Sequence, residues 1–150
     1  MEHEITISNR QKSLDISASS LRRLVEFVAE AEGREIDSID VAIVDADEIA
    51  SLNIRYLGKD EVTDVLSFDI SEANSPGISA QIVVCGDVAA EVGPRHNMSG
   101  DEELMLYIIH GLLHLMGYDD AEDELAKRMK RRQEQMLAEF NRARKVTDDL

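Results

Sequence analysis

The segment from Ser99 to Met116 constrains the fold more than any other part of the chain. Ser99 and Glu102 form a capping-box pattern at its start, and apolar residues then follow around nearly the whole helical circumference. We therefore predict that this segment is the buried central helix of the fold. Two histidines, His110 and His114, lie within it four residues apart. Any fold of this chain must bury a helix that carries two imidazoles.

The two histidines predict a metal site. An i, i+4 spacing places both side chains on one helix face, one turn apart. The chain breaks at Gly117, and this turn can bring Asp119 or Asp120 back toward the imidazoles. We predict that His110, His114 and Asp120 ligate the metal, although either aspartate could instead cap the next helix. Three protein ligands and one open position are typical of hydrolytic zinc sites.

Gly111 argues against a metalloprotease. In the common helical zinc motif, His-Glu-x-x-His, the glutamate after the first histidine is the general base. Gly111 stands at that position and costs about 1 kcal/mol of helix propensity relative to alanine. Such a glycine indicates a close approach of another backbone or of substrate. A two-histidine, one-carboxylate iron oxygenase site is a further alternative, but the helical spacing and the lack of a β-barrel pattern disfavour it.

Hydrophobic periodicity predicts an α+β fold. Alternating apolar patterns predict strands over residues 4–8, 39–44, 62–70 and 81–84, the last extending as far as residue 89. Helical patterns predict helices over residues 19–32, 45–58, 99–116 and 119–144, with loops over residues 71–79 and 93–100. We expect a small four-stranded mixed sheet packed against helices, in a single metallohydrolase domain spanning residues 1–150.

Charge is unevenly distributed along the chain. The net charge is −15, which repels nucleic acid on average, yet half of the Lys and Arg residues lie between Lys127 and Lys145. That basic stretch fits a solvated helix face with i, i+4 ion pairs. No apolar run is long enough to span a membrane, and the start of the chain lacks a signal sequence. With the single Cys85, these features predict a cytoplasmic protein without a membrane partner.

Three motifs resemble those of one family. The stretch His110–Asp119 resembles the signature of the YbeY family, which are single-strand-specific endoribonucleases of bacterial ribosomal RNA maturation. Further similarity lies in Leu52–Tyr56, Asp60, Thr63–Phe68 and the pair Gly86-Asp87. The resemblance covers most of residues 50–120.

The resemblance implies a zinc-dependent endoribonuclease with one Zn²⁺ per chain. Its partners would be single-stranded RNA, ribosomal RNA precursors and the small ribosomal subunit. It would act in maturation of the 16S rRNA 3′ end and in ribosome quality control. The alternative is a catalytically weakened ribosome-assembly factor that binds RNA or ribosomal protein through the basic C-terminal helix.

Two positions depart from the family pattern. The family has a third histidine where this chain has Asp120, so the resemblance also implies a metal ligand there. It has an arginine, thought to meet the substrate phosphate, where this chain has Leu57. Arg55 lies two residues before Leu57, and on a helix that spacing places its side chain on a different face. Either Arg95 or Lys59 then supplies the phosphate contact, or activity is weaker.

Other residues have both functional and structural interpretations. Asp64 and Ser67 could line the cleft, or could make strand-end hydrogen bonds. Asp87 could orient an imidazole, or could be a turn residue. We expect the Tyr118 ring to pack under the ligand turn, and we expect His96 to lie outside the cleft. Asp64, Ser67 and Arg95 remain candidate cleft residues, with no definite catalytic role assigned to any of them.

Overall fold

A four-stranded mixed sheet forms one layer of the molecule, and the computed structural model describes residues 3–148. The strands are β1 (Glu4–Arg10), β2 (Ile36–Val44), β3 (Val65–Asp69) and β4 (Ile78–Cys85), in the order β1-β2-β4-β3. The pairs β1/β2 and β2/β4 are parallel, and β3 is antiparallel to β4 at the sheet edge. The predicted α+β class with a four-stranded mixed sheet is confirmed.

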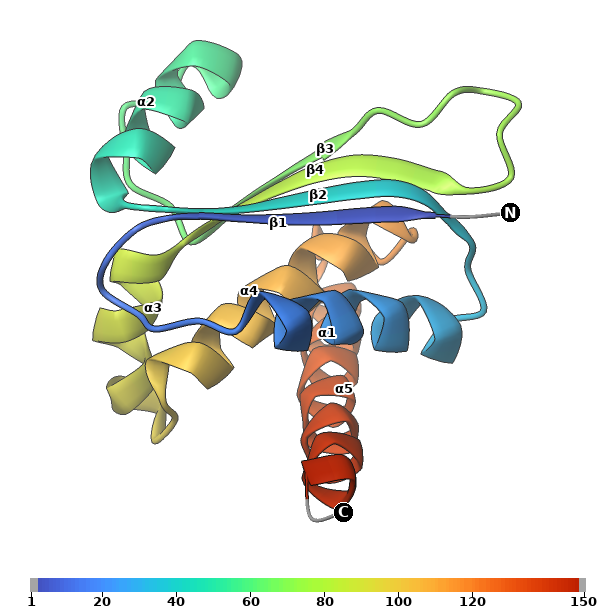
Figure 1. Ribbon diagram of the computed structural model, residues 1–150. Helices are drawn as coiled ribbons and strands as arrows, with labels where there is room; N and C mark the ends of the chain where they lie inside the picture. The colour runs from blue at the N-terminus through green and yellow to red at the C-terminus, as the bar shows by residue number, and fades with distance from the viewer. Residues whose placement is uncertain (1–2, 149–150) are drawn as a thin grey trace.

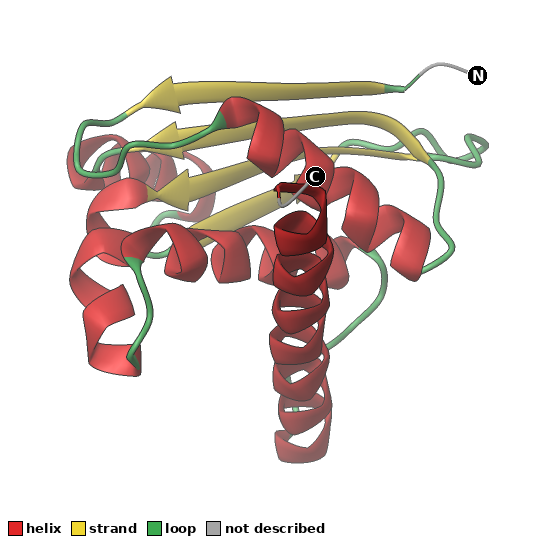
Figure 2. Cartoon of the chain, turned by 60° about the horizontal axis from the view of Figure 1, so that its bottom comes forward, coloured by secondary structure: helices red, strands yellow, loops and turns green. Residues whose placement is uncertain are grey.

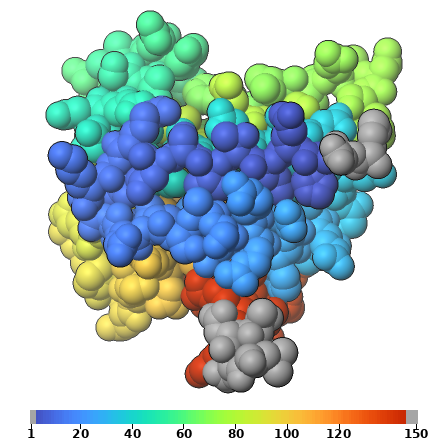
Figure 3. Space-filling view, in the orientation of Figure 1, coloured from blue at the N-terminus to red at the C-terminus, as the bar shows by residue number. Residues whose placement is uncertain are grey.

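Helices cover the two faces of this sheet unequally (Figure 1). They are α1 (Ala18–Ala31), α2 (Ala46–Leu57), α3 (Gly86–Val92), the 3-10 turn η1 (Gly93–His96), α4 (Gly100–Leu115) and α5 (Asp123–Asp148). One face packs against α1 and α4, with α5 below them, whereas α2 lies over one end of the other face. In the space-filling view, α2 and the β3–β4 connection rise above the middle of that second face (Figure 3).

Helix α4 is the buried centre of the fold, as predicted. Its apolar side chains fill the space between the sheet, α1 and α5, and several of them are fully buried: Leu104, Ile108, Ile109, Leu112 and Leu113. The capping box forms, since the Ser99 hydroxyl accepts from the Glu102 amide at 3.1 Å and the Glu102 carboxylate accepts from the Ser99 amide at 3.4 Å. Burial of this helix fixes where its two histidines emerge.

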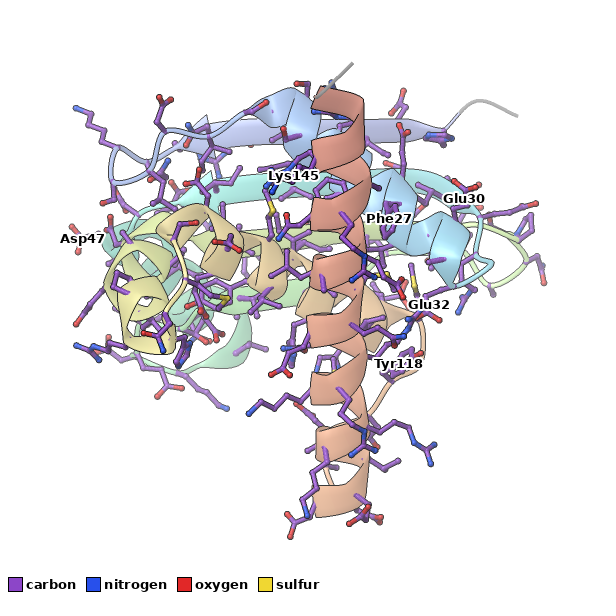
Figure 4. The ribbon with its side chains drawn as sticks, turned by 90° about the horizontal axis from the view of Figure 1, so that it is seen from below. Phe27, Glu30, Glu32, Asp47, Tyr118 and Lys145 are labelled. Atoms are coloured by element: carbon purple, nitrogen blue, oxygen red, sulfur yellow. The ribbon has the colours of Figure 1, made fainter. Side chains whose placement is uncertain are left out.

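Helix α5 crosses beneath α4 and projects away from the sheet (Figure 2). Its apolar stripe, Met129, Met136, Leu137 and Phe140, is buried. The Phe140 ring meets the Phe27 ring of α1 edge to face, with centroids 5.5 Å apart. Figure 4 shows Phe27, Glu32 and Tyr118 along one side of α5. None of the helices within residues 3–148 combines the length and apolar character needed to cross a bilayer.

Some predicted boundaries were wrong. The fourth strand ends at Cys85 rather than extending to residue 89, because Gly86–Val92 form the helix α3. Residues 87–90 include two alanines, and Asp87 occupies the first helical turn, where a negative charge is favourable. The last helix begins at Asp123 rather than at residue 119, because the preceding aspartates belong to the turn that follows α4.

Candidate metal centre and adjoining hollows

Three side chains converge at the end of α4. His110 and His114 lie one turn apart, with ring centroids 4.7 Å apart. Gly117 has a φ of 103°, which favours glycine, and the turn it allows returns Asp120 to the imidazoles. Asp120 Oδ2 lies 3.3 Å from His114 Nε2 and 3.9 Å from His110 Nε2. The predicted trio is therefore brought together, and its ligand atoms all lie within 4.8 Å of one another.

The spacing of these atoms suits a metal ion. Ligands bound to a tetrahedral zinc at about 2.0–2.1 Å lie about 3.3 Å from one another. The two histidine–aspartate separations, 3.3 and 3.9 Å, are near that value and longer than an ordinary N–H···O hydrogen bond. Two imidazole nitrogens and one carboxylate oxygen are also a donor set that zinc accepts. The residues present therefore could hold a metal ion.

Gln133 of α5 orients the first histidine. Its Oε1 lies 2.9 Å from His110 Nδ1. An amide oxygen only accepts hydrogen bonds, so Nδ1 donates, and the lone pair of Nε2 faces Asp120 and His114. Sequence reasoning missed this residue because it lies 23 positions away. The signal that could have revealed it is a polar side chain between the apolar positions Met129 and Leu137 of one helix stripe.

Asp87 does not orient an imidazole. Its carboxylate accepts hydrogen bonds from the Ser13 hydroxyl and from the Ala46 amide, the latter at 2.8 Å. These bonds lower the pKa of Asp87 below its usual value, and the bond from Ser13 has the larger effect. Asp87 therefore ties the β1–α1 connection to the start of α2, which is a structural role at the end of the sheet.

The turn that carries Asp120 is held from both sides. The Asp119 carboxylate accepts from the Ala121 amide at 2.9 Å, so it caps the turn. The Tyr118 hydroxyl donates to Glu32 at 3.0 Å, and Arg132 Nε donates to the same carboxylate at 2.8 Å. Burial and the bond to Glu32 raise the pKa of Tyr118. As expected, Tyr118 packs beside the turn, and its hydroxyl is occupied there.

Gly111 allows the edge strand to approach α4 closely. A Cβ at this position would lie 2.7 Å from the Ser67 hydroxyl oxygen and 3.4–3.5 Å from Ile82 and Val65. The close approach that Gly111 indicated is therefore made by a side chain of β3. It places Ser67 beside the helix turn that carries His110.

Two hollows in the surface meet at His110. The smaller, of about 490 Å³, lies along the β3 edge and includes Leu57, Ser67 and His114. The larger, of about 740 Å³, lies between α4 and α5 and includes His96 and Gln133. Asp64 borders both, so the candidate residues Asp64 and Ser67 lie beside the metal ligands. His96 borders the larger hollow, contrary to our expectation, because the turn η1 folds back against α4.

The cations expected to contact phosphate lie elsewhere. Arg95 forms an ion pair with Glu91 at 2.8 Å, and neither Arg95 nor Lys59 borders either hollow. Leu57 borders the smaller hollow with 53% of its surface exposed. Among the described residues around the two hollows, only one is a lysine or arginine. It is Lys130 of α5, which borders the larger hollow. Lys130 therefore offers a positive charge to a ligand in the larger hollow.

Comparison with known proteins agrees with this geometry. The model of the family described as Endoribonuclease YbeY matches residues 6–141. The chain belongs to the YbeY family. YbeY proteins are metal-dependent hydrolases that cleave RNA, and the cluster of two histidines and one aspartate gives this member a place for the metal.

Individual YbeY relatives match over most of their length. The chain is 34% identical to Endoribonuclease YbeY of Salinibacter ruber, over 89% of each chain. It is 38% identical to that of Alkaliphilus oremlandii, over 92% of this chain and 97% of the relative. The solution structure of TM1509 from Thermotoga maritima is 32% identical, with a TM-score of 0.64 over 95% of this chain and 93% of that one. Sequence and fold therefore indicate the same family.

Proposed function

We propose that this chain is a zinc-dependent, single-strand-specific endoribonuclease that processes ribosomal RNA. It would form a single domain over residues 1–150, bind one Zn²⁺ per chain and act in the cytoplasm. Its substrate would be the 3′ end of precursor 16S rRNA on the small ribosomal subunit, with a further role in ribosome quality control. The observation that carries the proposal is the convergence of His110, His114 and Asp120 where two surface hollows meet.

The residues in and around the cluster would have separate roles in hydrolysis. His110, His114 and Asp120 would hold the zinc, and Gln133 keeps the His110 imidazole in the tautomer that presents Nε2. When bound, zinc supplies Lewis-acid polarisation of the phosphodiester and activation of water. Lys130 offers the positive charge that the substrate backbone needs in an acidic protein. Asp120 offsets one positive charge of the metal, so we expect a weaker activation than a neutral third ligand would give.

The hollows favour an unpaired strand. They lie on the two sides of His110, so a strand that runs from one into the other passes over the ligand cluster. Single strands can turn their bases into such depressions, whereas the bases of a duplex are stacked and paired. This arrangement supports cleavage of single-stranded RNA.

Metal content and RNA cleavage, measured on the same samples, test the proposal. We expect about one zinc per chain in the wild type, cleavage of single-stranded but not double-stranded RNA, and loss of both metal and cleavage in His114→Ala. A protein that binds zinc but cleaves no RNA from mildly acidic to mildly alkaline pH would contradict the enzymatic proposal.

Two observations favour the second candidate, an assembly factor with weak cleavage. Leu57 borders the smaller hollow, where a cation would help most. Further exposed apolar residues lie nearby in sequence, Tyr56 on α2 and Ile70 just after β3. This candidate predicts that His110→Ala supports growth of cells that lack the protein. Charge reversal at Arg128 and Arg131 of α5 would then abolish growth. Arg132 is unsuitable for this test because it binds Glu32 within the fold.

A further inference from the structure

The larger hollow has the size of a ligand site and adjoins the metal ligands. Its volume of about 740 Å³ lies within the range of small-molecule pockets, about 300–1,000 Å³. Glu103 and His110 both border it, and they are separated by two turns of α4, or about 10.5 Å. A group bound near Glu103 is therefore too distant to touch a phosphate held at the His110 end. It would belong to a neighbouring part of the same strand.

Apolar side chains form part of the wall of this hollow. Val65 comes from the edge strand, Met98 from the segment before α4, Leu106 from α4, and Leu137 and Ala138 from α5. Side chains from four segments thus enclose one space. Apolar walls of this kind suit the flat face of a nucleobase better than they suit a ribose or a phosphate.

Carboxylates outnumber cations around the hollow, which disfavours a phosphate as its main occupant. The carboxylates of Asp64, Glu102 and Glu134 border it. Among its described lining residues, only Lys130 is a lysine or arginine. An anion would meet this excess of negative charge. A nucleobase with an exocyclic amino group would instead donate hydrogen bonds to carboxylate oxygens, as cytosine N4 does to Glu and Asp.

A buried carboxylate paired with a histidine at the rim forms one polar wall of the hollow. The Glu103 side chain is 5% exposed, and its Oε1 lies 2.9 Å from His96 Nδ1. Burial and the nearby Glu103 raise the pKa of Tyr107, the next residue on this helix face, so its hydroxyl stays neutral. His96 keeps 57% of its side chain exposed at the rim. A polar wall held by this pair, together with apolar walls, is an arrangement that can orient a bound base.

We propose that the larger hollow is a nucleobase subsite. It takes an unpaired base that flanks the phosphate at the metal centre, and it prefers adenine, cytosine or guanine, which carry amino groups, over uracil. The inference rests on the proposed ribonuclease function and adds a base preference to it.

Cleavage of designed RNAs tests the subsite. An oligonucleotide with one cleavage site is compared with versions in which each flanking nucleotide in turn is abasic, cytidine or uridine. We expect kcat/KM to fall about tenfold when the subsite base is removed, because the hydrogen bonds and apolar contacts of the base are lost together. Uridine should lie between the cytidine and abasic substrates. Equal rates for cytidine and abasic RNA at every flanking position would overturn the inference.

A variant that fills the hollow provides a matched comparison. Ala138→Phe places a ring in the space meant for the base, whereas Arg142→Phe adds the same ring to an exposed position of α5 outside the hollow. We expect Ala138→Phe to raise KM for the cytidine substrate and to abolish the preference over abasic RNA. Arg142→Phe should keep both the KM and the base preference of the wild type. An intact base preference in Ala138→Phe would refute the subsite.

Direct binding separates the subsite from the ribonuclease activity. In NMR titrations without metal, cytidine monophosphate should shift the Met98 methyl resonance at lower concentration than uridine monophosphate. The exposed Ile70 methyl, outside the hollow, serves as the internal control. If RNA is never cleaved but Met98 still responds selectively, the enzymatic proposal fails and the base subsite stands. If RNA is cleaved but neither nucleotide shifts Met98, the subsite is wrong.

Discussion

Two groupings of histidine and carboxylate, one at each end of helix α4, differ in geometry. Near its start, His96 Nδ1 and Glu103 Oε1 lie 2.9 Å apart, which is a hydrogen-bond distance. At its end, Asp120 lies 3.3 Å from His114 and 3.9 Å from His110. The first is a closed pair, whereas the second leaves room between its atoms.

Burial explains the difference. The Glu103 side chain is 5% exposed, and a buried carboxylate must be paired to offset its desolvation. The Asp120 side chain is 46% exposed and needs no such partner. Its position beside two imidazoles follows from the turn at Gly117 instead. A carboxylate that is near histidines without being forced there by burial is the better candidate for a metal ligand.

The largest expected effect is on zinc affinity, which should fall when a histidine of the second grouping is removed but not when His96 of the first is removed. His114→Ala should lower zinc affinity by more than about 100-fold, because loss of a ligand exceeds the 10–100-fold typical of losing a supporting hydrogen bond. His96→Ala should retain the metal, since His96 pairs with Glu103. Metal content after dialysis measures both. Loss of metal in His96→Ala would mean that the comparison between the two groupings is wrong.

Substitutions at the third ligand sharpen the same point. Asp120→Ala should lose most of the bound zinc, while Asp120→His, which restores a donor atom at the same place, should retain it. Isothermal titration with zinc compares the two variants. Glu122→Ala is the control, because this exposed carboxylate lies outside the cluster. Normal zinc binding by Asp120→Ala would exclude this residue as a ligand.

Stability should respond most at the closed pair. His96→Ala leaves the buried Glu103 without its imidazole and should lower the free energy of unfolding by about 2–3 kcal/mol. Adding Glu103→Gln should recover part of that loss, because a neutral amide is less costly to bury. Urea unfolding of metal-free protein gives both values. A double variant less stable than His96→Ala would show that the charge of Glu103 serves another contact.

Gln133→Ala tests the link between the metal centre and α5. Without the acceptor at Nδ1, the His110 ring can adopt the other tautomer and other orientations. We expect zinc affinity to fall by about 10–100-fold with the fold intact. The exposed neighbour Gln135→Ala is the control. Circular dichroism should be unchanged in both, and equal zinc affinities would show that Gln133 does not orient the ligand.

The smallest effect lies far from both groupings and depends on pH. Asp87 has a lowered pKa because Ser13 and the Ala46 amide donate to it, so its stabilisation is full above the unfolded-state pKa of about 3.9. It is lost as the pH falls through the lower folded-state value. Asp87→Asn should therefore cost about 1 kcal/mol at neutral pH, with the difference shrinking in acid. Urea unfolding midpoints of the wild type and the variant, measured at neutral and at acidic pH, test this.

Local patterns predicted what depends on nearby residues. The i, i+4 histidines, the capping box of α4 and the turn at Gly117 each lie within a few residues of one another, so spacing alone located them. The contact of Gln133 with His110 and the position of Lys130 depend on how α5 crosses α4. No short-range pattern encodes that crossing. The helix over Gly86–Val92 was missed because a short, partly apolar run that follows a strand fits a strand or a helix equally well.

The exposed turn that carries Asp120 has a consequence for how this protein can evolve. His110 and His114 are held by the buried helix, and their side chains are 30% and 34% exposed, less than the 46% of Asp120. The third position can accept another donor residue without any repacking. A lineage can therefore alter its metal preference through single substitutions at this turn while the rest of the protein remains under unchanged selection. An aspartate at this turn, where the resemblance in sequence implies a histidine, is the kind of variation that such an arrangement permits.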